Sequence, residues 1–314
     1  MSKIEEEIQE LKKSRDAIVL AHFYQSDEIQ DVADAVGDSL FLAQKGFESK
    51  AKVVVLAGVV FMAESVKLLS PEKIVLVPDL EAGCSLVSST PDDKYREWRE
   101  KYPDAIAVTY INSSATVKAM SDIICTSSNA EKIIDSIPKD KKILFGPDKN
   151  LGHWLVKKTG REMLLWQGAC EVHVLFSAEN LSRMKSEHPN AVVLAHPECD
   201  DAVLAYADVI GSTSKLLSEV GSNPATEFIV ATEDGIFHKM RKLRPDAVLI
   251  QAPIDNTCAC NRCPYMRLNS LEKIRDALKN LGPQVVLDEK LRVRARLPLE
   301  RMLSVSEGRS VQFH

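Results

Sequence analysis

The chain repeats a short apolar run followed by polar, ring-bearing residues three times. The three segments are DAIVLAHFY at 16–24, DAIAVTYIN at 104–112 and NAVVLAHPE at 190–198. Their β-branched residues fall on both faces of an extended chain, a pattern typical of buried parallel strands. His22, Tyr110 and His196 therefore occupy equivalent places at the ends of three predicted strands.

Three further sets of segments recur in the same register. DAVGDS at 34–39 matches DIICTS at 122–127 and DVIGST at 208–213. Apolar runs ending at Gly58, Gly146 and Thr232 follow, and each copy then closes with a strand and a loop that ends in cysteine, at Cys84, Cys170 and Cys263. Matched cysteines and hydroxyls at matched offsets indicate a triplicated unit, because ordinary strand–helix alternation would not place them in step.

Each unit alternates strands with helices, such as the helix predicted over 28–36. This alternation predicts an α/β fold of three three-layer αβα units with parallel sheets. Ligands of such sheets bind beyond the carboxyl ends of the strands, where all these polar residues fall. We therefore expect three units, at 1–87, 88–173 and 174–265, to be related by a pseudo-threefold axis through one central active site.

The two ends of the chain read as helices that pack against this body. Ile4, Ile8 and Leu11 recur at helical spacing near the N-terminus. Residues 266–314 contain two more helical patterns, at 271–281 and 297–305, separated near Gly282 and Pro283.

Composition and charge argue against two classes of protein, nucleic-acid binders and membrane-spanning proteins. The 314 residues are 45% hydrophobic and 27% charged, with a net charge of −5, which argues against a basic nucleic-acid surface. The longest apolar run, 53–63, is far shorter than the ~20 residues of a membrane span. The acidic, amphipathic N-terminal segment does not resemble a secretory signal, so we expect a cytoplasmic protein.

Seven cysteines leave metal binding, redox chemistry and structural burial open, because a reducing cytoplasm disfavours a disulfide framework. One cysteine per unit, Cys84, Cys170 and Cys263, suits a [4Fe–4S] cluster in which one iron lacks a protein ligand. Such an open iron is a Lewis acid. Cys125 and Cys199 are expected to be buried, unreactive thiols, while Cys258 and Cys260 remain open between a redox pair, spare thiols and ligands of a second metal.

The strand-end groups form matched pairs two residues apart. We expect each pair to lie on one face of an extended segment and to point at the shared centre. Three hydroxyls and His173, which follows Cys170 closely, complete a set that suits binding of a small polyanion and acid–base chemistry. The pairs and hydroxyls are His22 with Tyr24, Tyr110 with Asn112, His196 with Glu198, and Ser39, Ser127 and Thr213.

Taken together, the motifs resemble the quinolinate synthase family over essentially the whole chain. The motifs are AHFYQ (21–25), QDVADAVGDSL (30–40), VVFMAE (59–64), YINSSA (110–115), TSSNA (126–130), FGPDKNLG (145–152), HPEC (196–199), GSTS (211–214) and CPYM (263–266).

The resemblance implies a reaction. Iminoaspartate and dihydroxyacetone phosphate would condense and cyclise to quinolinate, with loss of phosphate and water, to supply NAD biosynthesis. An aspartate-oxidising enzyme would provide the iminoaspartate. The three-cysteine cluster would activate substrate through its open iron.

The resemblance also implies site roles. Tyr24 and Glu198 look like the acid–base pair, with His22 and His196 also in the catalytic set. The substrate-binding set would comprise His22, Ser39, Tyr110, Asn112, Ser127, His173, His196, Glu198 and Thr213. Some family members carry Cys-x-x-Cys-x-x-Cys where this chain has Cys258-x-Cys260-x-x-Cys263, so a thiol switch at the first two cysteines is in doubt.

Two alternatives predict different chemistry. The diphthamide radical enzymes also place one cysteine from each of three repeats around a cluster, and they cleave S-adenosylmethionine. A zinc-stabilised binding module would instead use four tetrahedral Cys or His ligands, with the 258–263 segment as its local clip.

Overall fold

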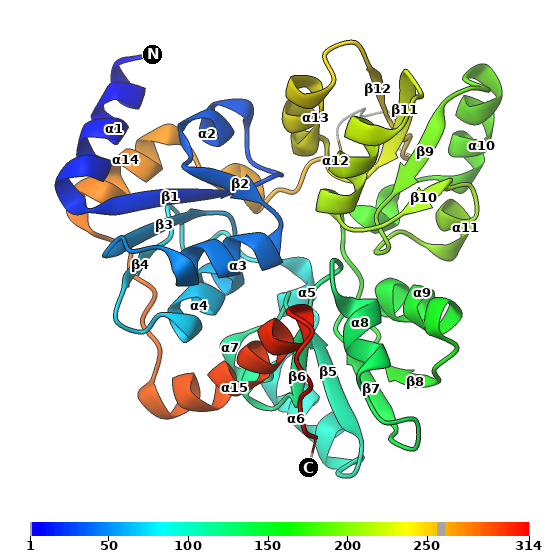
Figure 1. Ribbon diagram of the computed structural model, residues 1–314, viewed down its shortest axis with the longest axis horizontal. Coiled ribbons are helices and arrows are strands. Elements are labelled where there is room, and N and C mark those ends of the chain that lie inside the picture. The colour runs from blue at the N-terminus through cyan, green and yellow to red at the C-terminus, as the bar shows by residue number, and fades with distance from the viewer. Residues whose placement is uncertain (1, 256–260, 314) are drawn as a thin grey trace.

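Three four-stranded parallel sheets surround the centre of the molecule in the computed structural model, which describes residues 2–255 and 261–313 (Figure 1). The strand orders are β2-β1-β3-β4, β6-β5-β7-β8 and β10-β9-β11-β12. In each sheet the second strand along the chain lies at one edge, followed by the first, third and fourth strands. This confirms the predicted α/β class with three αβα units. No helix among the described residues is long and apolar enough to cross a membrane.

The first sheet and its helices fill the N-terminal part of the chain. They comprise α1 (Lys3–Arg15), β1 (Ala17–His22), α2 (Asp27–Val32), β2 (Ala35–Gly37), α3 (Ser39–Glu48), β3 (Val53–Ala57), α4 (Val60–Leu69), β4 (Ile74–Leu76) and α5 (Ser85–Ser88). The helix expected over 28–36 is shorter than predicted, because 35–37 pair with β1 as strand β2.

The second sheet repeats this order. Its elements are α6 (Asp92–Glu100), β5 (Ile106–Tyr110), α7 (Ala115–Ala119), β6 (Ile123–Cys125), α8 (Ala130–Asp135), β7 (Ile143–Gly146), α9 (Lys149–Thr159), β8 (Met163–Leu165) and the 3-10 helix η1 (His173–Leu175).

The third sheet repeats it again, and two helices end the chain. These elements are α10 (Ala178–Glu187), β9 (Val192–Ala195), α11 (Asp201–Leu204), β10 (Val209–Ile210), α12 (Thr213–Ser222), β11 (Glu227–Ala231), η2 (Asp234–Ile236), α13 (Phe237–Leu243), β12 (Val248–Gln251), η3 (Met266–Leu268), α14 (Leu271–Asn280) and α15 (Glu289–Ser306).

A matched aspartate closes the second strand of every unit against the first. Asp34, Asp122 and Asp208 each accept a hydrogen bond from a backbone N–H of the first strand, at 2.8, 2.7 and 2.8 Å. Each also pairs with a cation from a neighbouring helix: Lys12, Arg99 or Lys185. The three copies therefore share this aspartate interaction as well as the order of their strands.

Alternate residues of each central strand pack on opposite helical layers. In β1, Val19 and Ala21 belong to the core beneath α1 and α14, whereas Leu20 belongs to the core beneath α3 and α4. In β11, Ile229 faces the layer of α10 and α11, and Phe228 faces that of α12 and α13. This two-sided burial explains why the strands read as continuous apolar runs.

The terminal helices pack on the body. Ile8 of α1 and Ile274 of α14 share one core cluster with the first sheet. The apolar residues of α15, including Leu299 and Met302, join the core that also holds residues of the first and second sheets. This last helix begins at Glu289, earlier than the pattern at 297–305 predicted.

Candidate active site

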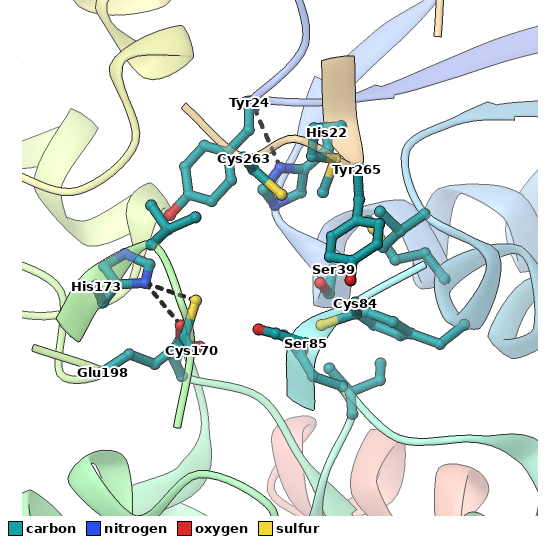
Figure 2. Close-up of a pocket in the computed structure, with 18 of the residues that line it drawn as sticks. His22, Tyr24, Ser39, Cys84, Ser85, Cys170, His173, Glu198, Cys263 and Tyr265 are labelled. Atoms are coloured by element: carbon teal, nitrogen blue, oxygen red, sulfur yellow. Dashed lines mark hydrogen bonds and ion pairs between the residues drawn. The ribbon is translucent and has the colours of Figure 1, made fainter. Parts of the chain in front are cut away.

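One cavity opens where the strands of all three sheets end, and all thirteen predicted site residues line it (Figure 2). They are His22, Tyr24, Ser39, Cys84, Tyr110, Asn112, Ser127, Cys170, His173, His196, Glu198, Thr213 and Cys263. The parallel topology explains the convergence, because each unit turns the carboxyl ends of its strands to the centre.

The three cysteines reach the cavity from the segments that follow the last strand of each sheet. In Figure 2 their sulfur atoms point into the space between them. Burial raises the pKa of the Cys84 thiol to about 12 and that of Cys263 to about 11, and it raises the pKa of Cys170 well above its ordinary value. Without metal these groups are therefore neutral thiols, and metal binding would release their protons.

Two buried carboxylates anchor the cysteine segments. Asp148 precedes α9 and accepts a hydrogen bond from the backbone N–H of Cys170 at 3.1 Å. Glu233 precedes η2 and accepts one from the backbone N–H of Cys263 at 3.3 Å, and it also pairs with Arg267 at 2.8 Å. Both side chains are fully buried, so they fix the cysteine backbones to the third strands of their units.

The spacing of the ligand atoms bears on the kind of metal that would fit. Within the described parts of the chain, only Cys170, His173 and Glu198 bring three possible ligand atoms within 4.8 Å of one another. With Zn–S bonds of about 2.3 Å, sulfurs that share one zinc lie no more than about 4.6 Å apart. At least two of the three cysteine sulfurs therefore lie farther apart than ligands of one zinc ion can.

His22 and His196 present neutral rings to the cavity. Burial lowers the pKa of His22 to about 4 and that of His196 to about 3. In each case the backbone N–H two residues ahead donates to Nδ1, from Tyr24 at 3.2 Å and from Glu198 at 3.4 Å. The remaining proton then lies on Nε2, so both rings offer an uncharged N–H donor.

Glu198 is the buried anion of the site. Tyr110 donates to its Oε1 at 2.5 Å, and His173 Nδ1 lies 2.9 Å from its Oε2. Burial alone would raise the pKa of this carboxyl, but the imidazoles of His196 and His173 and the donated hydrogen bonds hold it below its usual range. Burial and the Glu198 charge raise the pKa of Tyr24 and Tyr110 well above 10, so both phenols keep their protons.

The three predicted hydroxyls lie beside a hub that the sequence did not reveal. Asp38 Oδ2 accepts hydrogen bonds from the Oγ atoms of Ser128 and Ser214, both at 2.6 Å. Its Oδ1 accepts the backbone N–H of Phe41 at 2.9 Å and thereby caps α3. Asp38, Ser128 and Ser214 come from different units, and each is the sequence neighbour of a predicted hydroxyl: Ser39, Ser127 or Thr213.

A buried lysine stabilises the loop that carries Asn112 through hydrogen bonds to the loop carbonyls. Lys118 is fully buried and donates to the carbonyls of Ile111, at 2.9 Å, and Ser113, at 2.5 Å. Asn112 Oδ1 is buried without a hydrogen-bond partner among the described residues, so this acceptor is available to a donor group of a ligand.

The matched pairs meet in the cavity by a different route from the one predicted. The first strands end at His22, Tyr110 and Ala195, and Tyr24, Asn112 and Glu198 lie in the turns or bends that follow. The expectation of one extended face per pair was therefore wrong. In two of the three pairs the turn is closed by a hydrogen bond. The backbone N–H of Tyr24 donates to the ring of His22, and that of Glu198 donates to the ring of His196.

Other cysteine predictions have mixed outcomes. Cys125 and Cys199 are fully buried, as predicted. Cys258 and Cys260 lie outside the described residues, and so does the first half of the 258–263 segment predicted as a metal clip.

Sequence reasoning missed several polar residues at or beside the cavity, among them Asp38 and Thr232. Asp38 could have been found as a capping residue directly before Ser39, since aspartate favours that position. Thr232 bonds Tyr24 and His173, and its only signal was that it replaces the glycines of the other two copies.

Comparison with known proteins gives one consistent result. The model of the family described as quinolinate synthetase A protein matches residues 6–304. A quinolinate synthase of Chloroherpeton thalassium is 54% identical over 303 residues, which cover 96% of this chain and 94% of that protein. Those of Nostoc punctiforme and Prochlorococcus marinus are 52% and 50% identical, covering 95% and 98% of this chain and 92% of each relative.

Proposed function

Because the chain belongs to the quinolinate synthase family, enzymes of NAD biosynthesis, we propose that its cavity condenses iminoaspartate with dihydroxyacetone phosphate. The products are quinolinate, phosphate and water. The observation that carries this proposal is the convergence of three cysteines, neutral hydrogen-bond donors and a buried carboxylate in one cavity.

Cys84, Cys170 and Cys263 are the proposed ligands of a [4Fe–4S] cluster. Their position in one cavity, one cysteine from each predicted unit, supports this assignment. When bound, the cluster would supply an open iron that acts as a Lewis acid on a substrate oxygen or nitrogen. A reducing cytoplasm, the compartment we propose, would keep these thiols free to bind iron.

The dicarboxylate substrate is proposed to bind through uncharged donors. His22 and His196 offer Nε2–H groups, and the hydroxyls and the Asn112 amide add further donors. Uncharged donors suit this site, because they bind carboxylates without neutralising the nearby Glu198. The set comprises His22, Ser39, Tyr110, Asn112, Ser127, His173, His196, Glu198 and Thr213.

Tyr24 and Glu198 are proposed as the acid–base pair. Tyr24 keeps its proton and can donate it, while Glu198 is ionised and can accept one. They approach the cavity from different units, so a substrate between them would meet an acid on one side and a base on the other. An aspartate-oxidising enzyme is the proposed source of the iminoaspartate.

Three measurements separate this proposal from its rivals. Anaerobically reconstituted protein should bind about four irons and form quinolinate from the two substrates. Tetrahedral zinc in a colourless protein would support the binding module instead. Cleavage of S-adenosylmethionine, with no quinolinate formed, would support a diphthamide-type enzyme.

A further inference from the structure

Gln30 is a buried side chain of the short helix α2 and lies outside the cavity lining. Its Nε2 donates to the carbonyl oxygens of Phe23, Gln25 and Gly235, at 3.0, 2.9 and 2.8 Å. Phe23 and Gln25 flank Tyr24 in the turn at the end of β1, and Gly235 belongs to η2. One amide therefore joins the Tyr24 turn of the first unit to the third unit.

The three carbonyls determine which end of the amide faces them. Each carbonyl is an acceptor, so the side-chain nitrogen must point at them, because the side-chain oxygen has no proton to donate. Gln30 Oε1 has no hydrogen-bond partner among the described residues, which agrees with this orientation. The amide has two protons for three acceptors, so all three bonds require the turn and η2 to keep their present separation.

Close packing at Gly235 fixes the same contact independently. A Cβ at this position would lie 2.8 Å from the carbonyl oxygen of Phe23 and 2.8 Å from the Cα of Tyr24, distances that Cβ atoms essentially never show. The backbone of η2 therefore touches the backbone of the turn directly. Figure 1 shows α2 on the side of the first unit that faces α13, and His238 of α13 pairs with Asp27 of α2 at 3.1 Å.

We propose that Gln30 is a positioning residue that sets the separation between the Tyr24 phenol and the Glu198 carboxylate. Tyr24 belongs to the first unit and Glu198 to the third, so no local backbone geometry fixes the distance between them. The contacts of Gln30 with both units constrain that distance. This inference rests on the proposed function, in which Tyr24 is the acid and Glu198 is the base.

Glutamine to methionine is the sharpest perturbation, because it keeps the length of the side chain and removes both donor protons. Q30M should lower kcat by about 10- to 100-fold, the scale on which small misplacements of catalytic groups act. KM and iron content should stay within about threefold of wild type, because most of the binding residues and the three cysteines lie outside the turn. Q30N, whose shorter amide cannot reach all three carbonyls, replaces Q30M if the methionine variant does not fold.

Arg161 provides a matched control for the lost hydrogen bonds. It is also buried, and its guanidinium donates to three carbonyls, those of Ile137, Pro138 and Lys141, at 2.9, 3.0 and 3.2 Å. These four residues lie outside the cavity lining. R161M should therefore lose stability by a similar mechanism while keeping wild-type kcat. A kcat loss in R161M equal to that in Q30M would overturn the proposal.

Gly235→Ala tests the same contact without changing Gln30. The added methyl group must push the turn away from η2, so G235A should lower kcat as Q30M does. Gly46 is the control, because a Cβ there would lie 2.8 Å from Val66 Cγ1 in the core of the first unit, away from the cavity lining. G46A should keep kcat, and wild-type kcat in G235A would overturn the proposal.

A double variant separates positioning of Tyr24 from general packing. If Gln30 acts through Tyr24, Q30M should cost little further kcat in a Y24F background. Full additivity of the two losses, or wild-type kcat in Q30M, would overturn the proposal.

Amide hydrogen exchange reports on the turn without activity. The backbone N–H of Tyr24 donates to His22 Nδ1 at 3.2 Å, and that of Gln25 donates to the His22 carbonyl at 3.0 Å. In metal-free protein, Q30M should speed exchange of these two amides by about tenfold, whereas R161M should leave them unchanged. Unchanged exchange in Q30M would overturn the proposal. If exchange responds as expected but the wild type forms no quinolinate, that failure counts against the proposed function alone.

Discussion

Asp38 should contribute strongly to substrate binding, although no sequence pattern assigned it a functional role. Its carboxylate accepts a hydrogen bond from a serine hydroxyl of each of the other two units, and it also caps the N-terminus of α3. Asp38→Asn keeps the size of the side chain but removes the charge that strengthens both contacts to serine.

The structure sets the scale of the effect. A hydrogen bond to a charged group contributes about 1.5–3 kcal/mol and a neutral one about 1 kcal/mol. Weakening two such bonds should cost about 2 kcal/mol in the free energy of unfolding. If the whole loss also appeared in binding, KM for iminoaspartate would rise about 30-fold, because the loosened residues adjoin Ser39, Ser127 and Thr213.

Steady-state kinetics and thermal unfolding of D38N would measure both effects. S128A and S214A each remove one of the two bonds and should each give part of the change. Asp92→Asn is a suitable control, because Asp92 accepts a similar hydrogen bond from Ser114 at 2.7 Å away from the cavity lining. Wild-type KM and stability in D38N would refute the reasoning.

Three further predictions follow from the site. Cys84→Ala should prevent cluster formation, seen as lost iron and lost visible absorbance after reconstitution; normal loading would contradict the three-cysteine assignment. His22 titrates near pH 6.5 when unfolded and about 4 when folded, so the unfolded chain alone binds the proton between these values. As pH drops across that window, protonation of this group should lower the unfolding free energy of the metal-free protein by about 1.4 kcal/mol per pH unit. Chemical denaturation of H22Q should show a shallower dependence of the unfolding free energy on pH. A dependence equal to that of wild type would contradict the burial argument. Lys118→Met should cost about 1–3 kcal/mol, because the buried Ser113 carbonyl loses its donor while the Ile111 carbonyl keeps the backbone N–H of Ser113. The variant should also weaken dicarboxylate binding through Asn112; thermal unfolding and KM at wild-type values would contradict this.

The repeat was readable in the sequence because its elements follow local rules. Buried strands, matched hydroxyls and one cysteine per copy recur at nearly fixed offsets, and a parallel sheet dictates that strand ends meet. This logic predicted the fold class and gathered all thirteen site residues into one cavity. The unit boundaries near residues 87, 173 and 265 stay a prediction, as do the roles of the site residues.

The sequence could not show contacts between units. Asp38 bonds serines that lie far away in the chain, and Thr232 joins Tyr24 to His173, so neither contact has a local pattern. The turns after His22 and Ala195 were also missed, because a backbone N–H that bonds a histidine ring leaves no periodic signal. Packing of the three units creates the contacts of Asp38 and Thr232, whereas the two histidine turns are local to their own strand ends.

Product formation by the cluster-loaded protein tests the central claim most directly. Under anaerobic conditions, iminoaspartate and ¹³C-labelled dihydroxyacetone phosphate should give labelled quinolinate with one phosphate released per molecule. Protein with its full iron content that forms no labelled quinolinate would contradict the account.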